Sequence, residues 1–242
     1  MTERMRASAR EMRHMVGRYL HSRGCPGYAV NAVRDAIMAA QAEGFDAVTE
    51  MERVRASYPE ARTSFIVGRV GERLVLDGDA TPALLLAPAL IDELALAASA
   101  GDSSAVVRNV RGIDMFAALG EYAAVRGVAF RIGPASGAAG DSGESATVAF
   151  ERTPATPVSP ADSAAGPAMQ RILLDGYELD ADQFWRLFHE SNEALTPDSE
   201  ISRRHAGSQL YDEQGNLLGE VSEETYLHLR REAGNSPQAV LA

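Results

Sequence analysis

The chain has little cysteine, an excess of acidic over basic residues, and no long apolar run. Cys25 is the one cysteine among 242 residues, so a disulfide within the chain is excluded. Lys and Arg number 23 against 34 Asp and Glu, a formal net charge of −11. This balance argues against nucleic acids and anionic membrane surfaces as partners, because both bind proteins through basic surface.

The apolar residues do not form a leader or a membrane span. The first 24 residues mix charged and apolar groups without a continuous apolar segment, which argues against a signal peptide. The most apolar stretch, 82–100, is interrupted by Pro88, Asp92 and Glu93. This stretch therefore predicts a buried helix rather than a membrane span. We expect the protein in the cytoplasm.

Motifs for metal binding and for serine nucleophiles are also missing. The sequence has no H-E-x-x-H, no C-x-x-C and no G-x-S-x-G. The GDSG at 140–143 lies in a low-complexity stretch, where we interpret it as coincidence. No metal site is expected.

Periodicity along the chain predicts an α/β fold with an N-terminal helix pair and a mixed sheet covered by helices. The first helix, over 4–22, ends at Gly24–Gly27, and the second ends at Gly44. The elements expected after them are strands 62–70 and 73–77, helix 82–100, strand 105–108, helix 113–126 and strand 128–132.

Composition divides the chain into three segments. Residues 1–133 carry the helix pair and the α/β core, and 134–168 read as a mobile linker of Gly, Ala, Ser, Pro and Asp with one possible strand at 147–152. Residues 169–242 predict a small α/β segment: a strand at 171–176, a helix capped by Asp180, a hairpin over 208–221 and a last helix from Ser222.

The RNVRGID junction at 108–114 concentrates polar groups where a strand is expected to meet a helix. Arg108, Asn109 and Arg111 lie there together with Gly112. One interpretation is a solvated turn. The other is a clamp for a small carboxylic acid, because guanidinium groups bind carboxylates in a bidentate manner and a helix start offers free N–H groups.

Candidate proton-transfer residues lie at two further places. His205 follows Arg203 and Arg204, and it is the best acid/base candidate because histidine titrates near neutral pH; the alternative is a solvated loop. Asp46 is either a base or a residue without a chemical role. The other histidines, His14, His21, His189 and His228, lie on predicted helices, where we expect surface or packing roles.

Several motifs together resemble the type II malate/L-lactate dehydrogenase family. AQAEGFDAVTE (40–50) is similar to that family's ADLRGHDSHGV, and LVLDGDATPALLLAPALIDELALAA (74–98) to its strand and Ala-rich helix. AVVRNVRGID (105–114) is similar to VAVRNSNHFG, and RILLDGYELDADQFWRL (171–187) to the end of the family's chains. The resemblance implies a dehydrogenase-like fold and a homodimer.

The resemblance breaks at the residues that carry the family's hydride chemistry. The histidine of its RNSNHFG motif falls on Gly112, and the two histidines of GHDSHG fall on Phe45 and Val48. These side chains cannot transfer a proton at neutral pH. The low-complexity segment also stands where the family supplies much of its nicotinamide site, so no cofactor is expected.

Three hypotheses follow. The first is a cofactor-independent enzyme that acts by proton transfer on a small 2-oxo, 2-hydroxy or imino acid, as an isomerase, hydratase or cyclase. Arg108, Asn109, Arg111, Arg203 and Arg204 would bind this acid, and His205 or Asp46 would be the base. The second is a non-catalytic binding or partner subunit, and the third is an NAD(P)-dependent reductase with a rearranged site.

Overall fold

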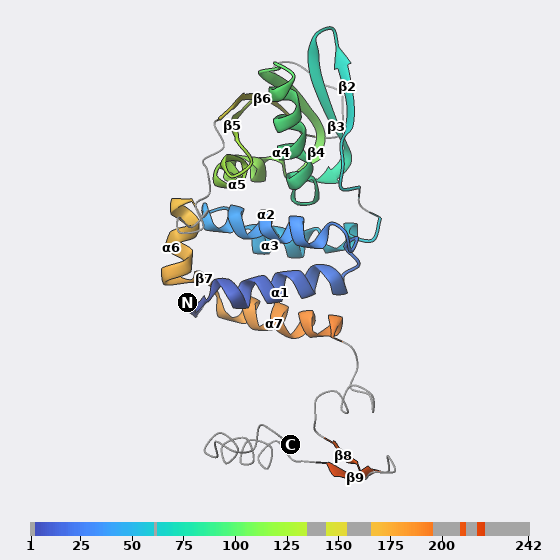
Figure 1. Ribbon diagram of the computed structural model, residues 1–242, viewed down its shortest axis with the longest axis vertical. Coiled ribbons are helices and arrows are strands. Elements are labelled where there is room, and N and C mark those ends of the chain that lie inside the picture. Colours follow the sequence, from blue (N-terminus) through green and yellow to red (C-terminus); the bar gives the residue numbers. More distant parts are fainter. Residues whose placement is uncertain are drawn as a thin grey trace, which may run out of the picture. The chain divides into compact units, whose positions relative to one another are not determined.

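The computed structural model describes residues 3–60, 62–134, 144–153, 166–195, 209–211 and 217–220. The chain divides into two units, Met1–Leu195 and Thr196–Ala242. The first unit is an α/β structure in which a layer of helices lies against a five-stranded sheet (Figure 1). The predicted fold class is therefore confirmed.

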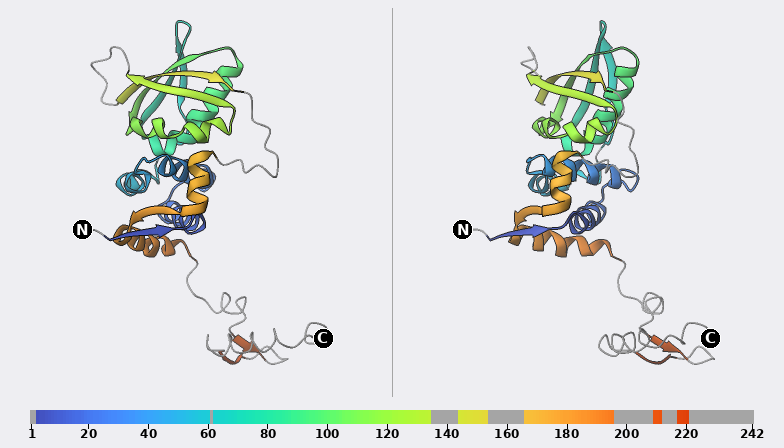
Figure 2. Two further views of the ribbon diagram at one scale, coloured as in Figure 1. Left: turned by 90° about the vertical axis from the view of Figure 1, so that its left-hand side faces the viewer. Right: turned by 60° about the vertical axis from the view of Figure 1, so that its left-hand side comes forward.

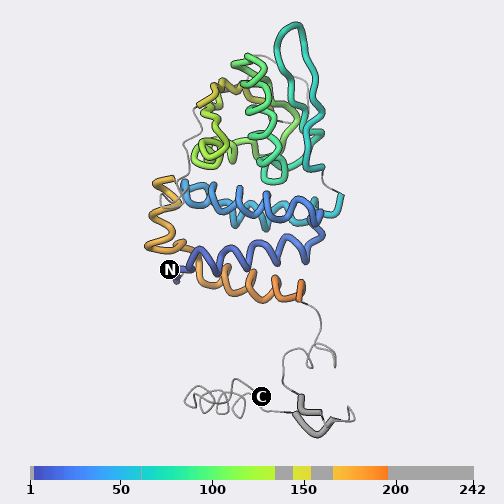
Figure 3. Tube along the Cα trace, in the orientation of Figure 1, coloured from blue at the N-terminus to red at the C-terminus, as the bar shows by residue number. Residues whose placement is uncertain are grey.

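The helical layer is built around α1. Ser8 and Glu11 form a capping box at its start: the Ser8 hydroxyl accepts from Glu11 N at 3.2 Å, and the Glu11 carboxylate accepts from Ser8 N at 2.8 Å. One face of α1 is buried against α2, and α7 packs beside α1 although it lies far along the chain (Figure 3). The helices of the unit are α1 (Ala9–Ser22), α2 (Val30–Ala42), α3 (Ala47–Arg53), α4 (Ala83–Ser99), α5 (Gly120–Ala124), α6 (Pro167–Asp175) and α7 (Ala181–Ser191), with 3-10 turns η1 (Arg55–Ser57), η2 (Ile113–Ala118) and η3 (Asn192–Ala194).

The sheet has the strand order β2-β3-β4-β6-β5, and only β3 and β4 are parallel. Helix α4 makes the crossover between these two strands and covers one face of the sheet (Figure 2). Leu76, Val107 and Val148 point to this covered face and are fully buried. The strands are β2 (Ile66–Val70), β3 (Arg73–Pro82), β4 (Ser104–Arg111), β5 (Val128–Pro134) and β6 (Glu144–Arg152), and a separate antiparallel pair joins β1 (Arg4–Ala7) to β7 (Tyr177–Asp180).

Three local predictions are wrong. Residues 171–176 lie mostly in helix α6 rather than in a strand, because their apolar side chains suit a helix face as well as a sheet; the strand expected there is β7, one residue later. The helix expected over 113–126 is interrupted at Leu119, between η2 and α5. The first helix is preceded by strand β1 and begins only at Ala9.

The strand proposed inside the low-complexity segment is present and central. It is β6, which lies between β4 and β5 and pairs antiparallel with both. Of the rest of the predicted linker, 135–143 and 154–165 lie outside the described residues, and 166–168 form the N-cap and the start of α6. The boundaries predicted at 133 and 168 remain predictions.

In the second unit, β8 (Gln209–Tyr211) pairs antiparallel with β9 (Leu217–Glu220), as the predicted hairpin requires. The last helix expected from Ser222 lies outside the described residues. None of the helices in the described part of the chain combines the length and the apolar character that crossing a bilayer requires.

Candidate functional site

Residues 108–111 of the RNVRGID junction form the second half of β4 rather than a turn after the strand, and Asp77 lies opposite Arg108 in the parallel strand β3. Arg108 donates from Nε to Asp77 Oδ2 at 2.9 Å, and the Asn109 amide donates to Asp77 Oδ1 at 3.2 Å. Burial raises the pKa of Asp77, but hydrogen bonds from Asp79 N and Asn109 and the charge of Arg108 outweigh it, so the net pKa is lowered. Asp77 is therefore a fixed carboxylate that holds the predicted clamp residues.

The backbone around Asp77 is strained. Asp79, Ala80 and Asn109 all have positive φ, at 50°, 56° and 56°, a region that residues with a side chain rarely adopt. The pairing of β3 with β4 shifts register between Asp77 and Thr81 at the same place. Such strain concentrates at functional sites and costs roughly 1–3 kcal/mol per residue.

The second arginine and the following turn are also engaged. Arg111 donates from Nε to Ala80 O at 2.7 Å and from Nη2 to Ser57 Oγ at 2.9 Å. The N–H of Ile113, the first residue of the 3-10 turn, donates to Glu144 Oε2 at 2.8 Å. The sequence predicted that a backbone N–H at this helix start would be free to bind an anion. In the structure this N–H donates to a carboxylate of the chain itself.

Of the two proton-transfer candidates, the structure describes Asp46 alone. Asp46 is the N-cap of α3: its carboxylate accepts from Thr49 N at 3.3 Å, a structural role that neither prediction named. His205, Arg203 and Arg204 lie outside the described residues. The assignment of these residues as catalytic or substrate-binding remains a prediction.

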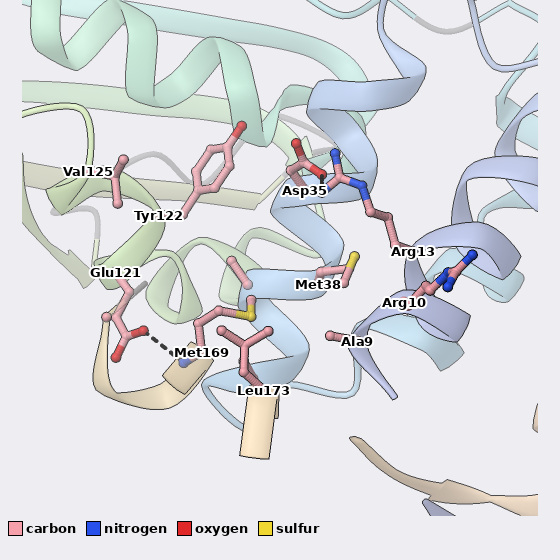
Figure 4. A pocket seen from close by; sticks show the side chains of 13 residues that line it. Ala9, Arg10, Arg13, Asp35, Met38, Glu121, Tyr122, Val125, Met169 and Leu173 are labelled. Atoms are coloured by element: carbon pink, nitrogen blue, oxygen red, sulfur yellow. Dashed lines mark hydrogen bonds and ion pairs between the residues drawn. The ribbon is translucent and has the colours of Figure 1, made fainter. Parts of the chain in front are cut away.

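An apolar cavity lies elsewhere, between α1, α2, α5 and α6, with a volume of about 440 Å³. Met38, Met169 and Leu173 converge on it, and Tyr122 and Val125 close one side (Figure 4). We call this the apolar cavity. Its size and its apolar lining are those of small-molecule sites.

Four charged residues line the apolar cavity: Arg10 and Arg13, one turn apart on α1, Asp35 on α2 and Glu121 on α5. Asp35 is 3.4 Å from Arg13 Nη1. Arg10 has no hydrogen bond or ion pair to the described residues. Arg10 is therefore the one lining guanidinium that no described side chain pairs, although the formal charges of the four residues sum to zero.

Glu121 and Tyr122, both on α5, already make hydrogen bonds within the protein. The Glu121 carboxylate accepts from Ala168 N at 2.6 Å and Met169 N at 3.2 Å, and so caps the start of α6 (Figure 4). Arg126 lies over the Tyr122 ring and donates to its hydroxyl at 2.9 Å. Burial raises the pKa of Tyr122, so the phenol stays neutral at neutral pH.

Sequence reasoning missed the apolar cavity. Its residues come from four helices, one of which was predicted as a strand, and no motif marks them. The available signal was the placement of Arg10 and Arg13 three residues apart on one helix face. No cluster of three or more His, Cys, Asp or Glu side chains placed to hold a metal ion occurs within the described ranges.

Comparison with known proteins gives little beyond this geometry. No protein-family model and no curated protein sequence matches the chain. Among solved structures, the malate dehydrogenase from Pyrococcus horikoshii OT3 is similar over 98% of this chain and 92% of its own, with 12% identity and a TM-score of 0.39. The malate dehydrogenase from Entamoeba histolytica is similar over 53% of this chain, at 17% identity and a TM-score of 0.39, and this chain spans only 38% of its length. We base no argument about function on likeness at this level.

Proposed function

We propose that the chain binds a small amphipathic carboxylic acid in the apolar cavity, as a binding protein rather than as a dehydrogenase. The observation that carries this proposal is the combination of an apolar volume of about 440 Å³ with a rim arginine, Arg10, that has no ion pair to the described residues. The ligand class is the one that the sequence predicted, but it is assigned to a different site.

The chemistry of the apolar cavity selects the ligand. Met38 and Met169 have flexible, polarizable side chains that adapt to an apolar body of varied shape. A carboxylate at the rim would pair with Arg10 through two parallel hydrogen bonds. A ligand amine would gain less, because Asp35 already pairs with Arg13 and Arg34.

The same contacts favour binding over proton transfer. The Glu121 carboxylate is already occupied by two backbone N–H bonds, and Tyr122 keeps its proton because burial raises its pKa. Non-catalytic binding, the second of the three sequence hypotheses, is therefore the one that the apolar cavity supports.

Calorimetric titration with straight-chain carboxylic acids and the matching alcohols tests this proposal. We expect the acids to bind more tightly than the alcohols, and Arg10→Gln to weaken the acids about tenfold without affecting the alcohols. Arg131→Gln is the matched control, because Arg131 is exposed on β5 and does not line the apolar cavity. Equal affinities for acids and alcohols, or equal losses in both variants, would reject the proposal.

A second candidate function is favoured by the strained backbone around Asp77. It is the proton-transfer reaction on a small 2-oxo, 2-hydroxy or imino acid, bound at Arg108 and Arg111. Deuterium uptake at the carbon next to the carbonyl of a 2-oxo acid, followed by proton NMR in D₂O, tests it. Uptake that Arg108→Gln abolishes and Arg10→Gln spares would support this candidate; tight NADH binding would support the reductase hypothesis instead.

The homodimer also remains a proposal, implied by the family resemblance. β2 is an edge strand whose Ile66, Val67 and Val70 are exposed, which is a surface suited to strand pairing. Sedimentation of wild type and of Val70→Lys tests it: a dimer that the lysine converts to a monomer supports pairing through β2, and a wild-type monomer removes the proposal.

A further inference from the structure

A second hollow of the surface has the opposite character to the apolar cavity. It lies between α1 and the start of α2 and has a volume of about 400 Å³. Its lining includes Arg13, His14, Arg18, His21 and Arg34, and no acidic residue lines it. We call it the basic groove. Such a concentration of cations is unexpected in a chain whose net charge is −11.

The sequence builds the basic groove from helix periodicity. His14, Arg18 and His21 are spaced by four and three residues and therefore share the exposed face of α1, opposite its buried methionines. Sequence reasoning assigned both histidines to surface or packing roles. The cationic face becomes a site only because α2 brings Arg34 alongside it.

The stem of Arg34 lies against Gly17 of α1. A Cβ at Gly17 would stand 3.4 Å from Arg34 Cδ, which is ordinary van der Waals contact. The Arg34 side chain is only 11% exposed, and its Nη1 donates to Asn31 Oδ1 at 2.8 Å. Arg34 is therefore held in place before any ligand arrives, which lowers the entropy cost of binding.

The charges of the basic groove are not balanced by nearby carboxylates. Asp35 is the one described acid in ion-pair contact with its arginines: it is 2.9 Å from Arg34 Nη2 and 3.4 Å from Arg13 Nη1. Arg18 is half-buried and has no hydrogen bond or ion pair to the described residues. Three guanidinium groups thus face one carboxylate, which leaves about two uncompensated positive charges.

The N-terminal end of α2 adds to the positive potential of the basic groove. Val30 and Asn31, its first two residues, line the basic groove. The preceding residue is Ala29, which has no side chain that caps the helix. The positive end of the helix dipole therefore acts in the same direction as the arginines.

We propose that the basic groove binds the phosphate monoester group of a small metabolite. A phosphate dianion matches two uncompensated charges, and its oxygens accept bidentate guanidinium bonds as a carboxylate does, but with twice the charge. A polynucleotide does not fit, because the arginines are confined to a hollow of about 400 Å³ on an otherwise acidic chain. This site is separate from the apolar cavity, with which it shares only Arg13.

Calorimetric titration of the full chain at low salt and neutral pH, with phenyl phosphate, inorganic phosphate and benzoate as probes, tests the proposal. We expect both phosphates to bind and benzoate to bind at least about tenfold more weakly in the basic groove, with affinities that fall as salt is added. Tighter binding of phenyl phosphate than of inorganic phosphate would show that an organic ester is recognised; equal binding would identify free phosphate as the ligand.

The variants locate the site. Arg18→Gln removes the unpaired guanidinium without breaking a described contact, and we expect it to weaken phenyl phosphate about tenfold. Arg131→Gln makes the same charge change on β5, and Arg10→Gln makes it at the apolar cavity; both should change phenyl phosphate binding less than about twofold. Equal losses in all three variants, or no phosphate binding by the wild type up to about 10 mM, would overturn the proposal. Because Arg18 does not line the apolar cavity, the two proposals fail independently.

Discussion

Replacing Gly78 by alanine should destabilise the first unit through steric overlap alone. Gly78 lies in β3 beside the strained turn, but its own φ is not positive, so an alanine backbone fits there. The added Cβ would stand 2.6 Å from Val110 Cγ2, 2.9 Å from Leu86 Cδ1 and 3.0 Å from Asn109 O. All three distances are shorter than van der Waals contact, and Val110 and Leu86 are fully buried.

The neighbours cannot all give way, which sets the size of the effect. Val110 has a stiff, branched side chain, and Asn109 O belongs to a backbone that is already at φ 56°. Overpacking of this kind costs about 1–3 kcal/mol, and the backbone contact places Gly78→Ala near the upper end. For a unit of this size, about 2–3 kcal/mol lowers the melting temperature by roughly 4–12 °C.

Urea unfolding followed by far-UV circular dichroism measures the loss. Gly68→Ala is the matched control, because Gly68 lies in the neighbouring strand β2 and a Cβ there meets nothing within 4 Å. Val110→Ala combined with Gly78→Ala should recover only part of the loss, since the contact with Asn109 O remains. If Gly78→Ala is as stable as Gly68→Ala, the close approach of β3 to β4 at this point is refuted.

Three further predictions concern groups whose contacts are fixed by the fold. The pKa of Asp77 is lowered below its ordinary 3.8, so Asp77→Asn should be less stable than wild type at neutral pH. This deficit in unfolding free energy should shrink as the pH falls below 3.8 toward the folded pKa of Asp77. A deficit that does not change with pH would contradict the pairing of Asp77 with Arg108. Burial raises the pKa of Cys25 from 9.0 to about 11. At pH 8, the thiol of the folded protein should therefore react with iodoacetamide at least about a hundredfold more slowly than the thiol of the urea-unfolded protein. Equal rates would refute the burial of Cys25. Tyr177→Phe removes a buried hydrogen bond to Met38 O at 3.0 Å and should cost about 1 kcal/mol in the same urea assay, whereas an unchanged midpoint would mean that the bond contributes nothing.

Predictions that rest on neighbouring residues agree well with the structure. The 82–100 helix and the 208–221 hairpin are found close to their predicted bounds, and the two paired strands are present, although β2 begins four residues later and β3 ends five residues later than predicted. Asp180 caps α7 as expected, with its carboxylate accepting from Gln183 N at 2.9 Å. Helix periods, turn residues and caps depend on side chains within about four positions of one another, so the sequence shows them directly.

The candidate site was predictable only in part. The sequence singled out Arg108 and Asn109 as a polar pair where the strand over 105–108 was expected to end, whereas β4 continues to Arg111 and holds both residues within the strand. It could not show that Asp77, some thirty residues earlier, accepts from both, because that contact depends on the parallel pairing of β3 with β4. The failure to recognise 171–176 as helical had a different source: an apolar run of that length is compatible with either a helix or a strand.

The sequence by itself indicated most of the helices and strands and their amphipathic faces, and the spacing of His14, Arg18 and His21 places them on one face of α1. Tertiary structure alone decided that β6, from a low-complexity stretch, lies inside the sheet, that α6 closes an apolar cavity against α2, and that Arg34 meets the α1 face across Gly17. The physical reason is that local patterns specify which side of an element is buried, whereas the partner that buries it is chosen by packing among all the elements at once.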